Sequence, residues 1–273
     1  MGKEGKEMED CNEYAEKKPW EVRKLIREGK ITGPTAGMCT GYAQANLVVL
    51  PREYAYDFLL FTQRNRKSCP LLEVTETGSR LTRECADGAD LATDIPKYRI
   101  YENGIMTGEY TDVSDYWRED LVSFLLGCSF SFESALLEAG IEVRHITEQK
   151  NVPMYITNID CVPAGAFSGK MVVSMRPIPQ AQVELAVQVT GKMPMVHGAP
   201  FHAGDPEAIG IHDLSRPDFG DSVTIRPGEV PVFWCCGVTP QSVVMHVKPS
   251  FCITHSPGHM FLTDTLNRDL MKR

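Results

Sequence analysis

Three stretches of the sequence combine imidazoles or a thiol with Gly or Pro. They are His197-Gly-Ala-Pro-Phe-His202, Cys236-Gly-Val-Thr239 and His255-Ser-Pro-Gly-His259. Histidine can accept or donate a proton near pH 7, and a cysteine near a helix N-terminus has a lowered thiol pKa. Loops rich in Gly and Pro have a restricted backbone geometry and often carry function. The residue types therefore indicate a site for acid–base chemistry on a small molecule.

Each of these stretches follows an apolar run that we predict to be a strand, at 193–196, 230–235 and 251–254. Ligands of open α/β sheets bind outside the carboxyl ends of the strands. We therefore expect the three stretches to share one crevice with the turn at 127–133.

A fourth stretch, residues 127–133, is predicted to be a loop that enters a helix. Ser131 can cap the first turn, and the Glu133 carboxylate complements the positive end of the helix dipole. Gly140 can take the left-handed conformation that ends a helix. The loop would then direct backbone N–H donors at an anion. The alternative, which is the more common case, is a capped core helix with Cys128, Phe130 and Phe132 packed inside.

Every candidate has a structural alternative. His197 and His202 could bind a metal, but Pro200 between them excludes a regular helical spacing, and no third ligand is fixed. Hydrogen-bonded structural histidines and inert buried thiols are common, so His255 and Cys236 each have this second interpretation. Arg176 could clamp a carboxylate bidentately or form a structural ion pair.

The elements that must position these residues follow from local pattern. Pro19 to Arg27, closed by Gly29, is predicted to be a helix, as are residues 51–61, 115–126, 179–190 and 239–248. Further strands are predicted at 47–50, 69–75, 98–104 (running into the Asn103-Gly104 turn), 141–146, 154–158, 171–176 and 222–225. This mixture indicates the α/β class, with a smaller α+β subdomain in the middle of the chain.

Composition excludes several classes of protein. The chain has 273 residues and a net charge of −8, which argues against a nucleic-acid partner. No apolar run reaches ~18 residues, so no membrane span is predicted. The nine cysteines form no CxxC pair, which disfavours a zinc ribbon, a thioredoxin motif and a disulfide framework. Residues 1–18 resemble a flexible lead-in rather than a targeting signal, and we expect a cytoplasmic protein.

Eight motifs together resemble the hydro-lyase family that includes the D-glutamate cyclases. They are Thr35-Ala-Gly37 with Gln44-Ala-Asn46, Cys69-Pro-Leu-Leu72, Asp94-Ile-Pro96, Gly127-Cys-Ser-Phe-Ser-Phe-Glu133, Val172-Val-Ser-Met-Arg-Pro177, His197-Gly-Ala-Pro200, Pro231-Val-Phe-Trp-Cys-Cys-Gly-Val-Thr-Pro240 and Ile253-Thr-His-Ser-Pro-Gly258. The resemblance runs from about residue 19 to residue 265. Cys235 stands where a small residue such as Ala is commoner in the family, which makes Cys236 the family cysteine.

The resemblance implies a fold and a reaction. The fold would be a three-layer α/β unit with a smaller two-layer α+β unit, divided here into a first α/β segment at 19–140, the α+β subdomain at 141–192 and a C-terminal segment at 193–273. The reaction would be the loss of water from D-glutamate, or a related amino dicarboxylate, to give 5-oxo-D-proline.

That reaction needs a base for the α-amine, activation of the γ-carboxyl and an anchor for the α-carboxylate. We expect His197 or His255 to act as the acid/base, with Cys236 and Glu133 near the reacting carboxyl. The candidate substrate-binding residues are Asn46, Cys128, Ser129, Ser131, Arg176, His202, Gly237 and Thr239. No cofactor is firmly implied, no residue is assigned to a metal, and a divalent metal is left open.

Two other functions fit the same residues. One is a regulatory protein of the same fold that binds a carboxylate without turning it over. The other is a Cys-dependent amidohydrolase. The expected partner is a small amino dicarboxylate, with no nucleic acid and no membrane, and a homodimer is the default expectation for the assembly.

Overall fold

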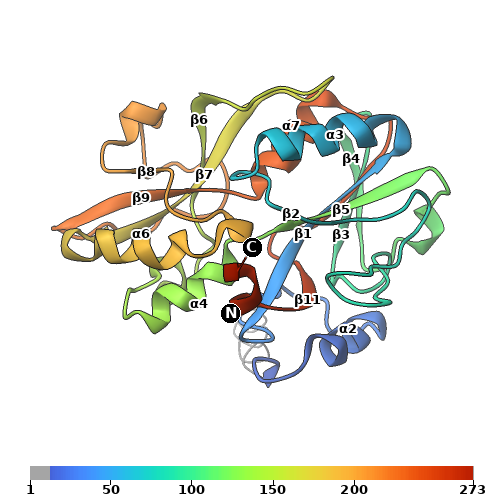
Figure 1. Ribbon diagram of the computed structural model, residues 1–273, viewed down its shortest axis with the longest axis horizontal. Helices are drawn as coiled ribbons and strands as arrows, with labels where there is room; N and C mark the ends of the chain where they lie inside the picture. The colour runs from blue at the N-terminus through green and yellow to red at the C-terminus, as the bar shows by residue number, and fades with distance from the viewer. Residues whose placement is uncertain (1–12, 273) are drawn as a thin grey trace. The chain divides into compact units, whose positions relative to one another are not determined.

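The computed structural model describes residues 13–272, so Cys11 and most of the predicted lead-in at 1–18 lie outside the described residues. Within that range the chain forms helices and two sheets, and every strand pair is antiparallel (Figure 1). The predicted mixed α/β class is confirmed. No helix in the described part is long and apolar enough to cross a membrane.

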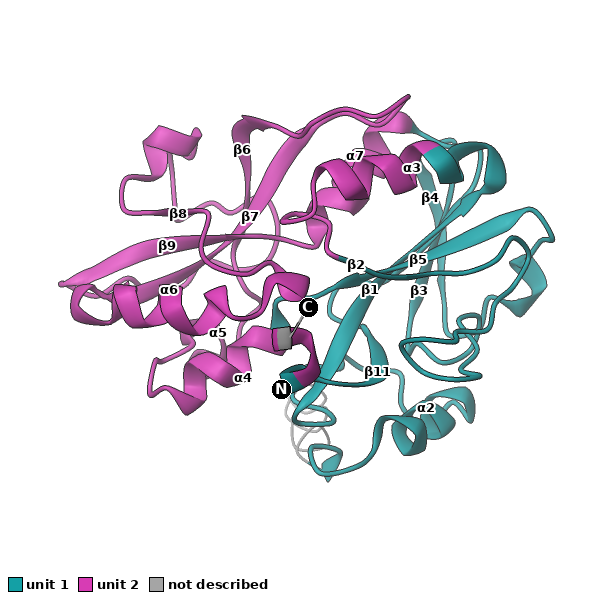
Figure 2. Cartoon of the chain, in the orientation of Figure 1, with its two compact units in different colours: residues 1–56, 71–130, 248–268 teal, residues 57–70, 131–247, 269–273 magenta. Residues whose placement is uncertain are grey.

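The chain divides into two compact units, each built from separate stretches (Figure 2). Unit 1 comprises residues 1–56, 71–130 and 248–268, and unit 2 comprises residues 57–70, 131–247 and 269–273. These divisions differ from the predicted segments at 19–140, 141–192 and 193–273, which stay a prediction.

Unit 1 contains a seven-stranded sheet in the described residues, with the order β2-β5-β1-β10-β3-β4 and with β11 paired to β1. Its strands are β1 (Tyr42–Pro51), β2 (Leu71–Val74), β3 (Tyr98–Glu102), β4 (Ile105–Tyr110), β5 (Leu121–Gly127), β10 (Cys252–His255) and β11 (Phe261–Leu266). The helix α2 (Pro19–Arg27) contacts β11. Buried side chains such as Leu47, Ile100 and Phe261 form the main core of this unit.

Unit 2 contains a four-stranded sheet in the described residues, with the order β6-β7-β9-β8. Its strands are β6 (Met154–Asp160), β7 (Lys170–Pro179), β8 (His202–Ala203) and β9 (Glu229–Cys235). Its helices are α5 (Arg144–Thr147), α6 (Val183–Gly191) and α7 (Val238–Val247), with the short 3-10 helices η2 (Gln180–Gln182), η3 (Pro194–Val196) and η4 (Pro206–Ile209). The helices α5, α6 and α7 all contact β7.

Three further helices include residues of both units. They are α3 (Arg52–Arg64), α4 (Phe130–Glu138), whose first residue belongs to unit 1, and η5 (Asn267–Lys272). The one remaining 3-10 helix of the described chain, η1 (Ser114–Tyr116), lies in unit 1.

The helix predicted at 115–126 is wrong. Its first residues form part of η1, and residues 121–127 form the buried strand β5 between β1 and β2. A short continuous apolar run fits a buried strand as well as a buried helix, so periodicity could not decide between them.

Three predicted strands are also wrong. Residues 141–146 run into the short helix α5, and Pro194 opens the 3-10 helix η3 instead of a strand at 193–196. Residues 222–225 have no regular secondary structure. The strands β9 and β10, which lead into two of the three stretches, belong to different sheets, so their carboxyl ends do not meet at one sheet edge. The single crevice stays a prediction.

Candidate functional site

The central strand of unit 2, β7, presents two different faces. Side chains alternate along a strand, so Val173 and Met175 share one face and Ser174 and Arg176 share the other. The first face packs into an apolar cluster with Phe233. On the other face the guanidinium of Arg176 donates to the hydroxyl of Ser174 at 2.8 Å, and both side chains are fully buried. The strand thus places a positive charge inside unit 2.

A buried carboxylate balances that charge. Glu133, in the first turn of α4, accepts hydrogen bonds at Oε1 from Nε of Arg176 at 3.2 Å and from its Nη2. Burial alone would raise the pKa of Glu133, but the charges of Arg176 and His145 outweigh it and lower the pKa to about 2. Glu133 is therefore ionised at neutral pH. Arg176 forms the ion pair that the sequence left as one alternative, rather than presenting a free fork to a ligand.

His145 completes this cluster. Its Nε2 lies 3.3 Å from Oε1 of Glu133, and its side chain is 6% exposed. The other ring nitrogen, Nδ1, is buried and has no hydrogen-bond partner among residues 13–272. Because Nε2 faces a carboxylate, we assign the neutral tautomer that carries its proton on Nε2, which leaves Nδ1 as an open acceptor. A carboxylate that orients an imidazole in this way is a common device for preparing a general base.

Two aromatic rings cover the guanidinium. The Cζ atom of Arg176 lies 4.9 Å from the ring centroid of Phe132 and 5.4 Å from that of Trp234. Trp234 is directly opposite Ser174 on β9, and its Nε1 donates to the hydroxyl of Thr190 at 3.1 Å. The rings keep water away from the ion pair, which strengthens the attraction between its charges.

Cys236, which follows β9, lies near the same face. Burial raises the pKa of its thiol to about 11, although the Val238 N–H, the charge of Arg176 and the Ser174 hydroxyl act in the opposite direction. The sequence left two interpretations of Cys236, a thiol pKa lowered by the nearby helix N-terminus and an inert buried thiol, and the dominant effect of burial favours the second. The thiol is protonated at neutral pH and is a poor nucleophile.

Gly237 lies between β9 and α7, and Thr239 lies in the first turn of α7. Thr239 is fully buried, and its hydroxyl hydrogen-bonds to the backbone N–H and C=O of Val172 at 3.0 and 3.1 Å. These bonds hold the start of α7 against β7. A role of either residue in binding substrate stays a prediction.

His197 and His202 lie elsewhere in unit 2. His197 follows η3 with a left-handed backbone (φ 81°), and its Nδ1 donates to the carbonyl of Lys67 at 2.9 Å. His202 lies on β8 and donates from Nε2 to the carbonyl of Asp205 at 2.7 Å. Across the described chain, no group of three His, Cys, Asp or Glu side chains is placed to hold a metal ion. A role for either histidine in catalysis, binding or metal coordination stays a prediction.

Four other candidates belong to unit 1, and a fifth, Ser131, belongs to unit 2. Asn46 on β1 donates to the carbonyls of Leu126 and Gly127 at 3.3 and 3.1 Å, which joins β1 to β5. His255 on β10 accepts the Leu47 N–H at Nδ1, 3.1 Å away, and burial lowers its pKa to about 4. Cys128 and Ser129 are buried between β5 and α4. Ser131 lies inside α4 rather than at its cap, because the helix begins at Phe130.

The sequence is closely similar to known proteins. The sequence model of the D-glutamate cyclase family matches residues 122–264. A protein of Clostridium beijerinckii named "Putative hydro-lyase" is 70% identical, and the match covers 94% of this chain and 98% of that protein. "Putative hydro-lyase YcsI" of Bacillus subtilis is 64% identical, with 92% and 98% covered.

The chain belongs to the D-glutamate cyclase family. The predicted resemblance is confirmed, and the names of the relatives support a hydro-lyase. The family match includes all five residues of the cluster that we call the Glu133 cluster: Glu133, His145, Ser174, Arg176 and Cys236. Among solved structures, a nitrogen repressor-like protein of Methanococcus jannaschii matches 91% of this chain and 99% of its own with a TM-score of 0.38 and 9% identity.

The D-glutamate cyclase family motifs in the sequence pointed to Glu133, Arg176 and Cys236, but not to His145. The sequence around His145 fitted a strand, and its carboxylate partner is a tertiary contact with α4. The local signal that was present is a run of ionisable residues, Glu142, Arg144 and His145, inside an otherwise apolar segment.

Proposed function

We propose that the protein is a hydro-lyase that converts D-glutamate, or a related amino dicarboxylate, to 5-oxo-D-proline and water. Family membership supports the reaction class. The observation that carries the proposal is the His145 imidazole, whose Nε2 faces a buried carboxylate and whose Nδ1 is open among the described residues.

The proposal assigns the open position at Nδ1 of His145 to the substrate amine. The α-ammonium must lose a proton before its nitrogen can attack the γ-carboxyl carbon, and Nδ1 accepts that proton. The amine nitrogen then attacks and the new C–N bond forms. Because the amide nitrogen of the product keeps one hydrogen, the nitrogen gives up a second proton by the same route, and both protons pass through Nδ1 to the departing oxygen, which leaves as water when the C–O bond breaks. The ionised Glu133 stabilises the imidazolium that exists during each transfer.

Arg176 has an indirect part in this scheme. Its Nε and Nη2 hold Glu133, and its Nη1 holds Ser174, so it fixes the carboxylate that orients His145. It is a positioning residue. Substrate binding by Ser131, His202, Gly237 and Thr239 of unit 2 remains part of the proposal. The substrate-binding roles of Asn46, Cys128 and Ser129, which belong to unit 1, stay predictions of their own.

The raised pKa of Cys236 argues against the Cys-dependent amidohydrolase. A thiol with a pKa of about 11 supplies little thiolate at pH 7. A nucleophilic cysteine would need a nearby base or cation strong enough to reverse the effect of burial.

The test is an assay of the purified full chain with D-glutamate, with L-glutamate as the stereochemical control and with reactions run with EDTA and with added divalent metals. Formation of 5-oxo-D-proline, or the opening of added 5-oxo-D-proline, supports the proposal. The absence of both reactions under all conditions would reject it. If D-glutamate then still raised the melting temperature, the carboxylate-binding regulatory protein would be the better description.

A further inference from the structure

The helix that carries His145 cannot hold its own position. α5 has four residues, Arg144–Thr147, and its N-cap residue Val143 makes no side-chain capping bond. An isolated single turn of helix is unstable in water because too few hydrogen bonds offset the cost of ordering the backbone. The direction of the His145 side chain is therefore set by tertiary contacts.

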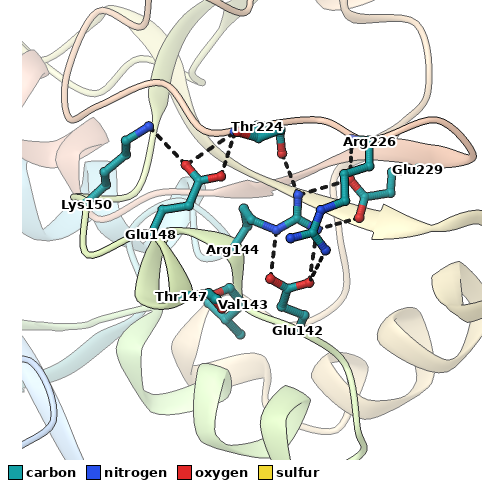
Figure 3. A network of polar contacts seen from close by, with 9 residues as sticks. All are labelled: Glu142, Val143, Arg144, Thr147, Glu148, Lys150, Thr224, Arg226 and Glu229. Carbon is teal, nitrogen blue, oxygen red and sulfur yellow. Dashed lines mark hydrogen bonds and ion pairs between the residues drawn. The ribbon is translucent and has the colours of Figure 1, made fainter.

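The neighbouring Arg144 supplies such contacts. Its side chain is 1% exposed and all five of its N–H donors are used (Figure 3). Two bonds reach Glu142, at 2.9 and 3.0 Å, and two reach Glu229, one of them at 3.3 Å. The fifth reaches the carbonyl of Thr224 at 2.7 Å.

Residues 221–229, which we call the strap, run alongside the α5 segment. The backbone of Asp221 pairs with Asn151, and the ammonium of Lys150 donates to the carbonyl of Ser222 at 2.8 Å. The N–H of Thr224 donates to the Glu148 carboxylate at 3.1 Å. Figure 3 shows Thr224 between the Glu148 and Arg144 contacts. Hydrogen bonds from α5 and from the residues that follow it thus join this segment to the strap.

The charges in this network balance. Glu142 also binds Arg226 at 3.0 Å, and Glu148 binds Lys150 at 2.9 Å. Three cations thus face three anions, with Glu229 as the third carboxylate. Arg144 is the cation that contacts both Glu142 and Glu229, and a lysine, with three donors instead of five, could not make the same set of bonds.

We propose that Arg144 is a positioning residue for His145, and this rests on the proposed function. By fixing α5 to the strap, Arg144 holds the imidazole against Glu133 and so keeps the proton on Nε2. Successive residues of a helix point about 100° apart, so one turn can direct Arg144 into the strap and His145 toward Glu133. The charged groups recorded around the His145 ring are Glu133 on α4 and, through it, Arg176 on β7.

The test compares Arg144→Lys with a matched arginine in unit 1. Arg23 is also buried, bonds bidentately to Asp264 and donates to the carbonyl of Leu262 at 2.7 Å. Arg23→Lys therefore makes a similar chemical change in the other unit. The first measurement is the ¹⁵N spectrum of the histidine side chains in the full chain across pH, with the His145 signal assigned from His145→Gln. The second is the pH profile of the cyclisation rate.

In the Arg144→Lys variant we expect the His145 signal to change from one tautomer to a mixture of two. The value of kcat should fall about 10- to 100-fold, with a much smaller change in KM. Arg23→Lys should leave the His145 signal and the pH profile unchanged. If Arg144→Lys does not fold, Glu142→Gln, which removes only the more exposed anchor, should produce the same changes at smaller size.

An equal fall in melting temperature for both arginine variants with an unchanged His145 signal would overturn the inference. The spectrum does not depend on turnover. A wild-type chain without cyclase activity, in which Arg144→Lys still changes the His145 tautomer, would reject the proposed function and keep the positioning role. If the wild-type chain is active and Arg144→Lys leaves the His145 tautomer unchanged, the proposed function would stand and the positioning role would be rejected.

Discussion

His145 and His255 are both buried imidazoles, but the two units give them opposite surroundings. In unit 2, His145 faces an ionised carboxylate and keeps an open ring nitrogen among the described residues. In unit 1, His255 lies in the strand β10, accepts a backbone N–H at Nδ1 and has a pKa lowered to about 4 by burial. Burial without a carboxylate disfavours the protonated form of an imidazole, whereas a neighbouring carboxylate stabilises that form.

A similar contrast is seen in two further pairs of buried polar residues. In unit 1, Asn46 and Glu73 direct their side chains to backbone groups, Asn46 to the carbonyls of β5 and Glu73 to the N–H groups of residues 83–85. In unit 2, Glu133 and Arg176 bind each other. Side chains that satisfy the backbone maintain the fold, while a group of mutually paired side chains with one open acceptor is suited to chemistry.

The largest effect should come from removing the open acceptor. We expect His145→Gln to lower the cyclisation rate by about 10²- to 10⁴-fold, because the variant lacks the ring nitrogen to which the proposal assigns the amine proton. His246→Gln, a change at an exposed histidine of α7, is the control and should retain the wild-type rate. The measurement is the initial rate of 5-oxo-D-proline formation. A fully active His145→Gln variant would mean that the contrast between the surroundings of His145 and His255 does not identify the base.

The next effect concerns stability. Arg176→Met would leave the Glu133 carboxylate buried without its cation, and we expect a loss of about 3–5 kcal/mol in the free energy of unfolding, measured in urea. The double variant Arg176→Met with Glu133→Gln should recover part of this loss, because no buried charge remains.

The control for this experiment is an exposed pair in unit 1. Arg83 and Glu76 are paired at 2.9 Å with side chains 72% and 71% exposed. Arg83→Met should therefore cost no more than about 1 kcal/mol. Similar losses for the two arginine variants would mean that Arg176 and Glu133 are better hydrated than their burial indicates.

A smaller effect appears in the pH dependence of stability. The folded chain holds His255 at a pKa of about 4, below the ordinary value of 6.5, so the unfolded chain binds the proton more readily between these values. Stability should fall as the pH drops from about 6.5 to 4, by roughly 3 kcal/mol from this residue. Glu133, with its pKa lowered to about 2, adds a further loss below about pH 4.5 as its carboxylate is protonated.

The variant that isolates the first window is His255→Gln, which keeps a side-chain acceptor for the Leu47 N–H. Urea unfolding at several pH values should show a flatter profile between pH 6.5 and 4 than in the wild type. A parallel shift of the whole profile, with its slope unchanged, would contradict the assigned pKa.

Local signals in the sequence predicted part of the fold. Pro19 opens α2, Gly29 is left-handed after it, and Asn103 and Gly104 both have positive φ in the turn between β3 and β4. Each of these features depends on one or two residues. The strand β5 was predicted as helix because its state depends on pairing with β1 and β2, which no local pattern reports.

The site could be predicted only by residue type. Glu133 and Arg176 stood out as a candidate anion-site residue and a candidate clamp, but their contact joins α4 to β7 across 43 positions of the sequence. His145 was missed because its role depends on a tertiary contact with Glu133, which no local pattern reports. The strand ends at 193–196, 230–235 and 251–254 looked equivalent, and the structure separates β9 and β10 into different sheets.

The smallest predicted effect is the reactivity of Cys236 toward alkylation. A thiol with a pKa of about 11 is ionised roughly 200-fold less at pH 8 than an ordinary cysteine, and burial restricts the reagent further. Mass spectrometry after treatment with iodoacetamide should find Cys236 unlabelled in the native chain and labelled once urea has unfolded it. Rapid labelling of the native chain that runs parallel to the loss of cyclisation would instead place a thiolate in the site. The division of roles between a base at His145 and an inert thiol at Cys236 would then be reversed.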